Sequence, residues 1–267
     1  MTTHPTAAQH PTALATTVLG SGPALLFAHG AGGSAEANYS PLLPGLAKDH
    51  TVIAPDYPGS GATPRATEPL TIDELADAVL AAADAAGART FTLVGYSLGT
   101  LVSVRIAARH PERVTGLVLT AGIVKPDNRL LAVVEVWRLL LEKGDLDSFA
   151  RFVALTGFSE EFFNGLPNDQ VEQFYRLVRD SVPAGTPDQA GVVATADVSA
   201  DLSRITAPTL VICPTGDALV SPAQSRRLAD GIAGAEYVEI PTGHVVMAER
   251  PAAWQRLIED FLSRHGL

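Results

Sequence analysis

The sequence predicts an α/β fold in which helices flank a mostly parallel β-sheet. Its 267 residues are within range of one large α/β domain or two small ones, and they suffice to bury a core. A chain that is 46% hydrophobic and 18% charged is not typical of disorder. Short apolar runs bounded by turn residues alternate with longer segments of helical periodicity, which is the pattern of βαβ units.

The predicted strands are short apolar runs of four to six residues. They cover 24–28, 51–54, 91–94, 116–120, 208–213 and 236–240. The segment 13–18 fits an additional antiparallel strand at one edge.

Helical periodicity predicts helices over 72–86, 98–109 and 252–264, and one that begins after Ser221. Thr71 and Glu74 have the spacing of a capping box, and Gly87 follows its helix as a stop. Ser221 precedes Pro222, which suits the first position of a helix.

Residues 123–205 break the alternation, because helical segments follow one another there without strands between them. Those segments are 130–142, 146–155, 160–163 and 169–180. We therefore expect a core of residues 1–122 and 206–267 and a separate helical subdomain over 123–205. Eight of the sixteen aromatic residues lie in it: Trp137, Phe149, Phe152, Phe158, Phe162, Phe163, Phe174 and Tyr175. They either form the subdomain's own core or, in part, line an apolar pocket beneath a lid.

The charge balance argues against several kinds of partner. A formal charge of −10 disfavours nucleic acid and anionic membrane surfaces. The most apolar stretch, 130–141, is interrupted by Glu135 and Arg138, so no membrane span is expected. No feature of the sequence specifies an oligomeric state.

The compartment and the cofactors are also constrained. A single cysteine, Cys213, cannot form an internal disulfide, and no basic residue precedes Lys48 to open a signal peptide. The N-terminal residues 1–6 read as a loose tail, and a cytoplasmic protein is expected. No cluster has metal-ligand spacing, and the glycines of 30–33 lack the spacing of a nucleotide-binding loop. We expect neither a metal nor an organic cofactor.

The pattern G-x-S-x-G occurs over Gly95–Gly99, directly after one predicted strand and directly before a predicted helix. That context lets the chain turn sharply at Ser97 and expose its hydroxyl as a nucleophile. The alternative is an ordinary Gly/Ser turn.

A serine nucleophile needs a histidine base and a carboxylate that orients it. Of the seven histidines, His244 lies in a loop between a predicted strand and the last helix, where it can reach Ser97. Asp217 follows the strand 208–213. The alternatives are a solvent-exposed histidine and an aspartate that serves only its own turn.

Five motifs in order make the chain resemble the α/β-hydrolase superfamily from about residue 13 onward. They are AHGAGG over 28–33, DYPGSG over 56–61, the turn at Ser97, PTLVICPTGD over 208–217, and Gly243–His244 followed by Glu-Arg-Pro at 249–251. The resemblance implies a helical lid inserted between the sixth and seventh strands. It also implies Ser97 as nucleophile, His244 as base and then acid, Asp217 as its orienting partner, and the backbone N–H groups of Ala31 and Leu98 as the oxyanion hole.

The resemblance further implies a lidded serine esterase, thioesterase or lactonase that acts on an apolar small molecule. The alternatives are C–C bond hydrolysis or perhydrolysis with the same residues, and a ligand-binding member with little turnover. Candidate substrate contacts are His29, Tyr96, Trp137 and Phe158. Of these, His29 is interpreted mainly as a structural residue that holds the oxyanion loop, and Tyr96 could either pack beneath that loop or face the substrate.

Overall fold

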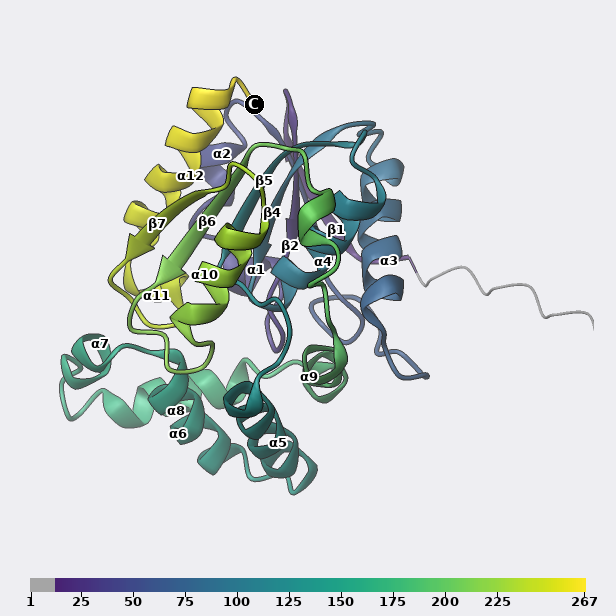
Figure 1. Ribbon diagram of the computed structural model, residues 1–267. Coiled ribbons are helices and arrows are strands. Elements are labelled where there is room, and N and C mark those ends of the chain that lie inside the picture. The colour runs from purple at the N-terminus through teal and green to yellow at the C-terminus, as the bar shows by residue number, and fades with distance from the viewer. Residues whose placement is uncertain (1–12) are drawn as a thin grey trace, which may run out of the picture.

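A seven-stranded sheet forms the centre of the protein, whose structure is a computed structural model describing residues 13–267 (Figure 1). The strand order is β1-β3-β2-β4-β5-β6-β7. Only β1 pairs antiparallel, with β3, and the other pairs are parallel. The strands are β1 (Thr16–Gly20), β2 (Ala24–Ala28), β3 (Thr51–Pro55), β4 (Phe91–Tyr96), β5 (Val114–Thr120), β6 (Thr209–Pro214) and β7 (Glu236–Ile240).

The mostly parallel sheet flanked by helices is confirmed, with one shifted strand. The predicted edge strand, 13–18, begins three residues later, at Thr16. Before that point the Ala15 N–H donates to the Thr63 side chain, so the chain is tied to a loop instead of the sheet. The tail predicted for residues 1–6 lies outside the described residues.

Four long helices flank the sheet at the places that periodicity predicts. They are α3 (Ile72–Ala85), α4 (Leu98–Arg109), α10 (Pro222–Gly231) and α12 (Pro251–His265). The capping box of Thr71 and Glu74 forms, and Ser221 caps α10. Short elements without a sequence signal are α1 (Ala35–Tyr39), α2 (Leu43–Leu46), α11 (Val246–Glu249) and a 3₁₀ turn over Leu202–Arg204.

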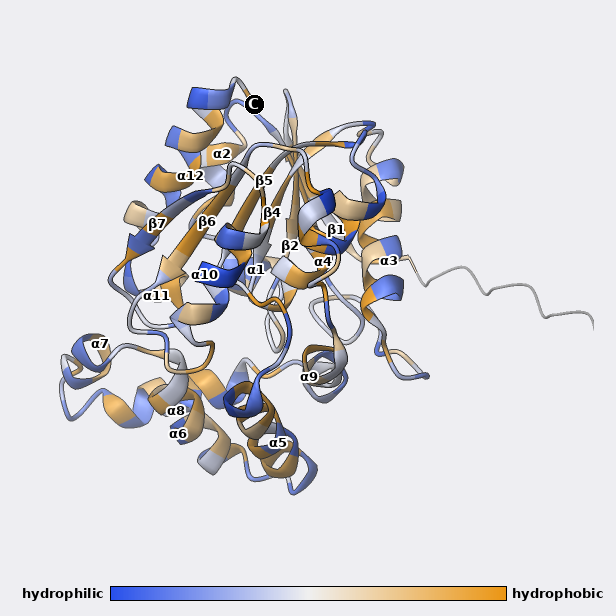
Figure 2. Cartoon of the chain, in the orientation of Figure 1, coloured by the Kyte–Doolittle hydropathy of each residue, from blue (hydrophilic) through white to orange (hydrophobic). Residues whose placement is uncertain are grey.

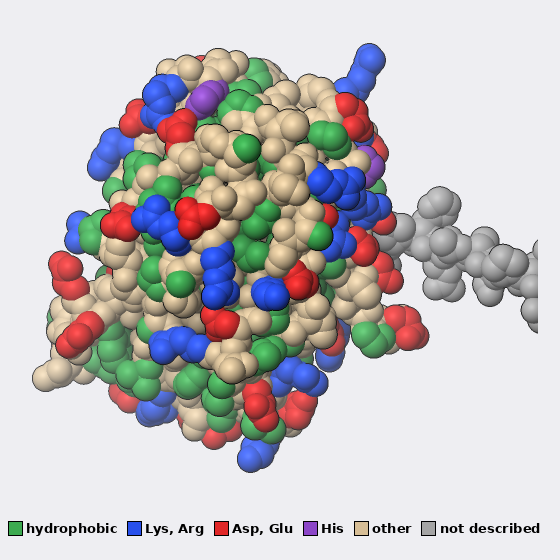
Figure 3. All heavy atoms as spheres, viewed as in Figure 1, with side chains coloured by type: hydrophobic (Ala, Val, Ile, Leu, Met, Phe, Trp, Pro, Cys, Tyr) green, Lys and Arg blue, Asp and Glu red, His purple; other side chains and the backbone are tan. Residues whose placement is uncertain are grey.

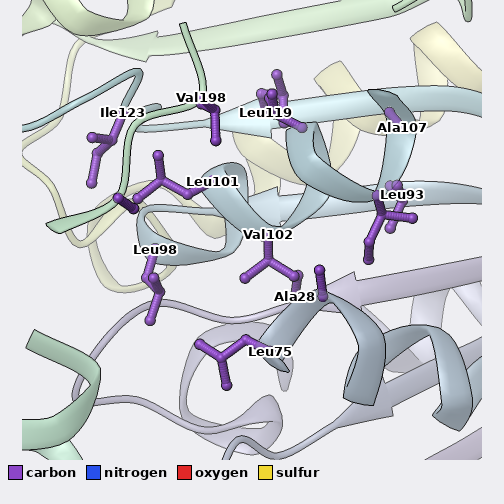
Figure 4. Close-up of a cluster of buried hydrophobic side chains, with 14 of the residues drawn as sticks. Ala28, Leu75, Leu93, Leu98, Leu101, Val102, Ala107, Leu119, Ile123 and Val198 are labelled. Atoms are coloured by element: carbon purple, nitrogen blue, oxygen red, sulfur yellow. The ribbon is translucent and has the colours of Figure 1, made fainter. Parts of the chain in front are cut away.

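Alternate residues of the strands supply two apolar layers, one on each face of the sheet. Leu26 and Leu93 pack toward α3 and α4, while their neighbours Leu25 and Val94 lie in the opposite layer with Trp254 of α12. Figure 2 shows the apolar residues concentrated in the strands, and Figure 4 shows side chains of the first layer around α4. The sheet is therefore held rigidly between helices, and the loops that leave its strands have fixed starting points.

Five helices between β5 and β6 form what we call the helical insertion, residues 123–205. They are α5 (Asn128–Glu142), α6 (Leu146–Gly157), α7 (Glu160–Asn164), α8 (Val171–Asp180) and α9 (Thr186–Thr195), and they lie beyond the carboxyl ends of the strands (Figure 1). The expected position between the sixth and seventh strands is wrong. A single strand precedes β2 in the described chain, so the insertion follows the fifth strand. The helix α9 was not predicted, because Pro187 and Gly191 obscure its periodicity.

Basic and acidic side chains alternate on the face drawn in Figure 3, without a large patch of one sign. Many of them pair. Arg105, for example, bonds Asp73 and Asp201 at 2.6 and 2.7 Å and so ties α4 to α3 and to the 3₁₀ turn.

Candidate active site

Ser97 stands at a sharp turn between β4 and α4. Its φ of 53° lies in the left-handed region, which is strained for a residue other than glycine. The flanking glycines make the turn possible, since a Cβ at Gly95 would lie 2.6 Å from the Gly99 carbonyl oxygen and one at Gly99 only 1.7 Å from that of Ala28. The Gly/Ser turn is thus a strand-to-helix turn that presents the hydroxyl at the carboxyl edge of the sheet.

The structure brings Ser97, His244 and Asp217 together in one hydrogen-bonded chain. His244 Nε2 lies 3.0 Å from Ser97 Oγ, and His244 Nδ1 lies 2.6 Å from Asp217 Oδ2. The three residues are only 6%, 5% and 7% exposed, respectively, so His244 is not a solvent-exposed loop histidine. A carboxylate only accepts hydrogen bonds, so Nδ1–H donates to it and the Nε2 lone pair faces the serine. This arrangement can remove the serine proton.

Asp217 also serves its own turn. Its Oδ1 accepts from the backbone N–H groups of Leu219 and Val220 at 2.9 and 2.8 Å. Asp217 therefore both stabilises its own turn and orients His244, because a different carboxylate oxygen makes each set of hydrogen bonds. The backbone bonds fix the direction in which Oδ2 points at the imidazole.

The loop 30–33 runs beside Ser97, and a Cβ at Gly30 would lie 3.3 Å from the Ser97 Cβ. Its N–H groups at 30, 32 and 33 donate to Asn38 Oδ1, Gln189 Oε1 and the Gly30 carbonyl oxygen. Among residues 13–267 no acceptor is found for the Ala31 N–H. Leu98 is the first residue of α4, where an N–H has no partner within the helix. Both predicted oxyanion donors are thus left available.

A cavity of about 230 Å³ opens onto Ser97 and His244 beneath the helical insertion. Three of the four predicted substrate contacts, Tyr96, Trp137 and Phe158, are among the residues that line it. No Lys, Arg, Asp or Glu of the described chain is among the lining residues. The rest of the wall is mostly apolar and includes Ile123, Leu130, Val133, Val134, Phe149, Val153, Val178, Val182, Val193, Leu219, Val245 and Met247.

His29 does not line this cavity, so the prediction that it contacts substrate is wrong. It is fully buried, its Nδ1–H donates to the Gly30 carbonyl at 2.8 Å, and its Nε2 accepts from the Tyr57 N–H at 2.9 Å. Burial lowers the pKa of His29 to about 4, against a smaller opposing effect of the Gly30 bond. A neutral His29 therefore holds the loop, as its main interpretation predicts.

Tyr96 has two functions in the structure. Its ring lines the cavity, and its hydroxyl donates to the His244 carbonyl oxygen at 3.0 Å. Burial raises the pKa of this phenol well above its ordinary value. A neutral Tyr96 thus supports the histidine loop from below while its ring faces the cavity.

Glu249 bridges the histidine loop and the helical insertion. Its Oε1 accepts from the N–H groups of Gly243 and Ser159 at 3.0 and 2.8 Å, and its Oε2 accepts from Ser159 Oγ at 2.6 Å. Nearby, the Val245 N–H donates to the Gly157 carbonyl at 2.9 Å. The Glu-Arg-Pro motif signalled this residue without indicating its partners. No sequence signal pointed to Asn38 or Gln189.

The described residues provide neither a group of metal ligands nor a membrane span. No three His, Cys, Asp or Glu residues within 13–267 are grouped so that they could hold a metal ion. None of the helices in that range is long and apolar enough to cross a membrane.

Comparison with known proteins agrees with this geometry. The family model described as the alpha/beta hydrolase fold matches residues 23–251. The pyrrolizixenacetamide deacetylase of Xenorhabdus hominickii is 38% identical over 91% of this chain and 92% of that protein. The 2-hydroxymuconate semialdehyde hydrolase of Pseudomonas sp. strain CF600 is 33% identical over 91% of this chain and 88% of its own.

A solved structure has a similar fold. The enol-lactonase from Burkholderia xenovorans LB400 superposes with a TM-score of 0.81 at 26% identity, covering 94% of this chain and 96% of the lactonase. The match of the family model over most of the chain, together with these relatives, shows that the protein belongs to the α/β-hydrolase fold family.

Proposed function

We propose that the protein is a serine hydrolase that cleaves an ester, thioester or lactone of a small apolar molecule through an acyl-enzyme on Ser97. The observation that carries the proposal is the chain of hydrogen bonds from Asp217 through His244 to Ser97, which ends in an apolar cavity. A serine that must act as nucleophile needs such a base, and a buried polar chain is otherwise costly to build.

The reaction follows from the positions of the atoms. Ser97 Oγ attacks the carbonyl carbon while its proton passes to His244 Nε2, and the carbonyl oxygen becomes an oxyanion facing the Ala31 and Leu98 N–H groups. The tetrahedral intermediate collapses, and His244 gives the proton to the departing oxygen or sulfur. Water then attacks the acyl-enzyme with His244 as base, which releases the acid and restores Ser97.

The cavity wall supports an uncharged substrate. Within residues 13–267, no Lys or Arg lines it to pair with an anionic substrate, and no Asp or Glu lines it to pair with a cationic one. A volume of about 230 Å³ suits a small acyl group or ring system. We infer that the helical insertion is a lid subdomain over 123–205, because its residues, such as Trp137 and Phe158, supply much of that wall.

A second candidate reaction is the removal of an acetyl group from an amide. The 38% identical relative is named as a deacetylase of an acetamide, and the same acyl-enzyme chemistry applies to that bond. The name of the 2-hydroxymuconate semialdehyde hydrolase directs attention to C–C bond hydrolysis. Perhydrolysis, like a ligand-binding role without turnover, remains an alternative to be measured.

The test is the intact mass of the protein after treatment with a fluorophosphonate, which reacts with activated serines. Wild type should gain one adduct, and Ser97→Ala should gain none. Ser103→Ala is the matched control, because Ser103 is a buried serine of α4 that does not line the cavity. It should react as wild type does.

An unreacted but folded wild type would count against the hydrolase and in favour of a binding role. With an adduct in hand, turnover of an ester, a thioester, a lactone, an acetamide and a diketone distinguishes the candidate bonds. Perhydrolysis is tested by adding hydrogen peroxide, because a perhydrolase then releases a peracid in place of the acid.

A further inference from the structure

A fully buried glutamine of α9, Gln189, joins the helical insertion to two loops of the core. Its Oε1 accepts from the Gly32 N–H at 2.9 Å. Its Nε2 donates to Ser60 Oγ at 2.8 Å and to the Pro58 carbonyl oxygen at 3.2 Å. An amide is costly to bury without partners, and this one has partners for its oxygen and for both of its N–H bonds.

The bond to Gly32 lies next to the oxyanion donor. The Gly32 N–H and the Ala31 carbonyl belong to one peptide group, so Gln189 fixes the peptide plane that follows Ala31. The plane before Ala31 is fixed from the core, because the Gly30 carbonyl accepts from His29 Nδ1–H and from the Gly33 N–H. The Ala31 N–H belongs to the plane held from the core, and Gln189 of the insertion holds the adjoining plane, so the backbone is anchored on both sides of Ala31.

The backbone of the insertion also packs tightly at this place. The Gly185 N–H donates to the Gly59 carbonyl at 3.0 Å, and a Cβ at Gly185 would lie 2.3 Å from the Pro58 carbonyl oxygen. A Cβ at Gly32 would lie 3.1 Å from the Thr186 methyl group. Gln189 thus stands at a close contact between α9 and the loop, where its reach to Gly32 is fixed.

We infer that Gln189 is a positioning residue, which acts through Gly32 to hold the backbone on the far side of Ala31 and so keeps the Ala31 N–H in place for the oxyanion. The inference rests on the proposed function, and it deepens it: the insertion holds part of the catalytic framework as well as part of the pocket wall. Preorganised donors contribute most when they need not reorient during the reaction. A support from the insertion at the peptide group that follows Ala31 meets that requirement.

The perturbing variant is Gln189→Met, which keeps the volume and loses every hydrogen bond. We expect kcat for p-nitrophenyl acetate to fall about 10- to 100-fold, less than or comparable to the loss of a whole oxyanion donor. KM should stay within about twofold, because Gln189 does not line the cavity.

The matched control is Gln224→Met. Gln224 is a second buried glutamine with the same pattern of bonds: it accepts from the Val124 N–H at 3.1 Å and donates to the Lys125 carbonyl and to Asp127 at 2.9 and 3.1 Å. It does not line the cavity or touch the loop 30–33. Its loss should destabilise the fold similarly and leave kcat within about twofold of wild type.

A second readout isolates the oxyanion. A boronic acid forms a tetrahedral adduct with a reactive serine, so its affinity depends on the oxyanion donors, whereas a non-reactive substrate analogue depends on the pocket. Gln189→Met should weaken the boronic acid by the same factor as kcat/KM and leave the analogue unchanged. If that variant does not fold, Gln189→Asn, one methylene shorter, replaces it and should show the same split.

The positioning role of Gln189 and the proposed hydrolase function can fail independently in these experiments. Equal kcat and equal boronic acid affinity in the Gln189 and Gln224 variants would overturn the positioning role while wild-type labelling of Ser97 kept the proposed function. Wild type that fails to react with the fluorophosphonate would overturn both.

Discussion

Replacing Asp217 by asparagine should abolish the base without disturbing the fold. The Leu219 and Val220 N–H groups donate to Oδ1, so the amide oxygen of the variant must take that position and its NH₂ must face His244 Nδ1. Two donors cannot face each other, and the imidazole proton therefore moves to Nε2. There it points at Ser97 Oγ, 3.0 Å away, and His244 can no longer accept the serine proton.

The expected loss in kcat is about 10⁴-fold, which is the effect of a wrong imidazole tautomer in a serine protease triad and corresponds to roughly 5 kcal/mol in the barrier. KM should change little, since Asp217 does not line the cavity. The assay is steady-state hydrolysis of p-nitrophenyl acetate, with the rate of fluorophosphonate labelling as a second measure.

Asp145→Asn provides the control for this change. Asp145 also holds a backbone N–H, that of Ser148, at the start of α6, and asparagine caps helices equally well. Its activity should equal that of wild type. Asp217→Asn activity within tenfold of wild type would refute the argument, because it would mean that the carboxylate does not set the tautomer.

Two further predictions concern stability. Gly99→Ala should lower the unfolding free energy by about 3 kcal/mol or more, because the new Cβ would lie 1.7 Å from the Ala28 carbonyl oxygen. Gly191→Ala in α9 is the control: no atom lies within 4 Å of its Cβ, and the unfolding free energy should rise by up to about 1 kcal/mol. Urea denaturation measures both, and equal stabilities would contradict the packing argument. Lowering the pH from 6.5 to 4 should reduce the unfolding free energy by up to about 3 kcal/mol through His29, because the unfolded chain takes up a proton that the buried imidazole, with a pKa of about 4, does not. His29→Asn should show a correspondingly weaker dependence in the same titration, and an unchanged slope would argue against this source.

The sequence predicted well those helices and strands whose own residues favour the structure that they form. The buried strands of the parallel sheet are continuous apolar runs, and α3 carries its capping box in its own sequence. By contrast, α9 has Pro187 as its second residue and contains Gly191, and its position is set by contacts with α5 and with the loop 58–60. Tertiary packing outweighs weak local preference there.

The difference between local motifs and distant contacts also explains which residues of the site could be predicted. Ser97, Asp217 and His244 stand in motifs whose loops leave parallel strands at one edge of the sheet, so the topology brings them together. For His29 the sequence left two functions open, support of the loop and contact with substrate, because its motif shows that it lies near the nucleophile and does not show which way the ring turns. Gln189 was missed altogether, since a glutamine in a helix has no pattern of its own until its partners, 157 and 129 residues away in the chain, are known.

The bonds of the helical insertion have a consequence for protein engineering and for the divergence of relatives. A segment placed between two strands resembles a module that could be exchanged to change specificity. Here its residues Gly157, Ser159 and Gln189 hold the loops of His244 and Ala31. We therefore expect a chimera that receives another protein's insertion to need these three anchor points, whereas substitution of a wall residue such as Phe149 changes the pocket and leaves the anchor points in place.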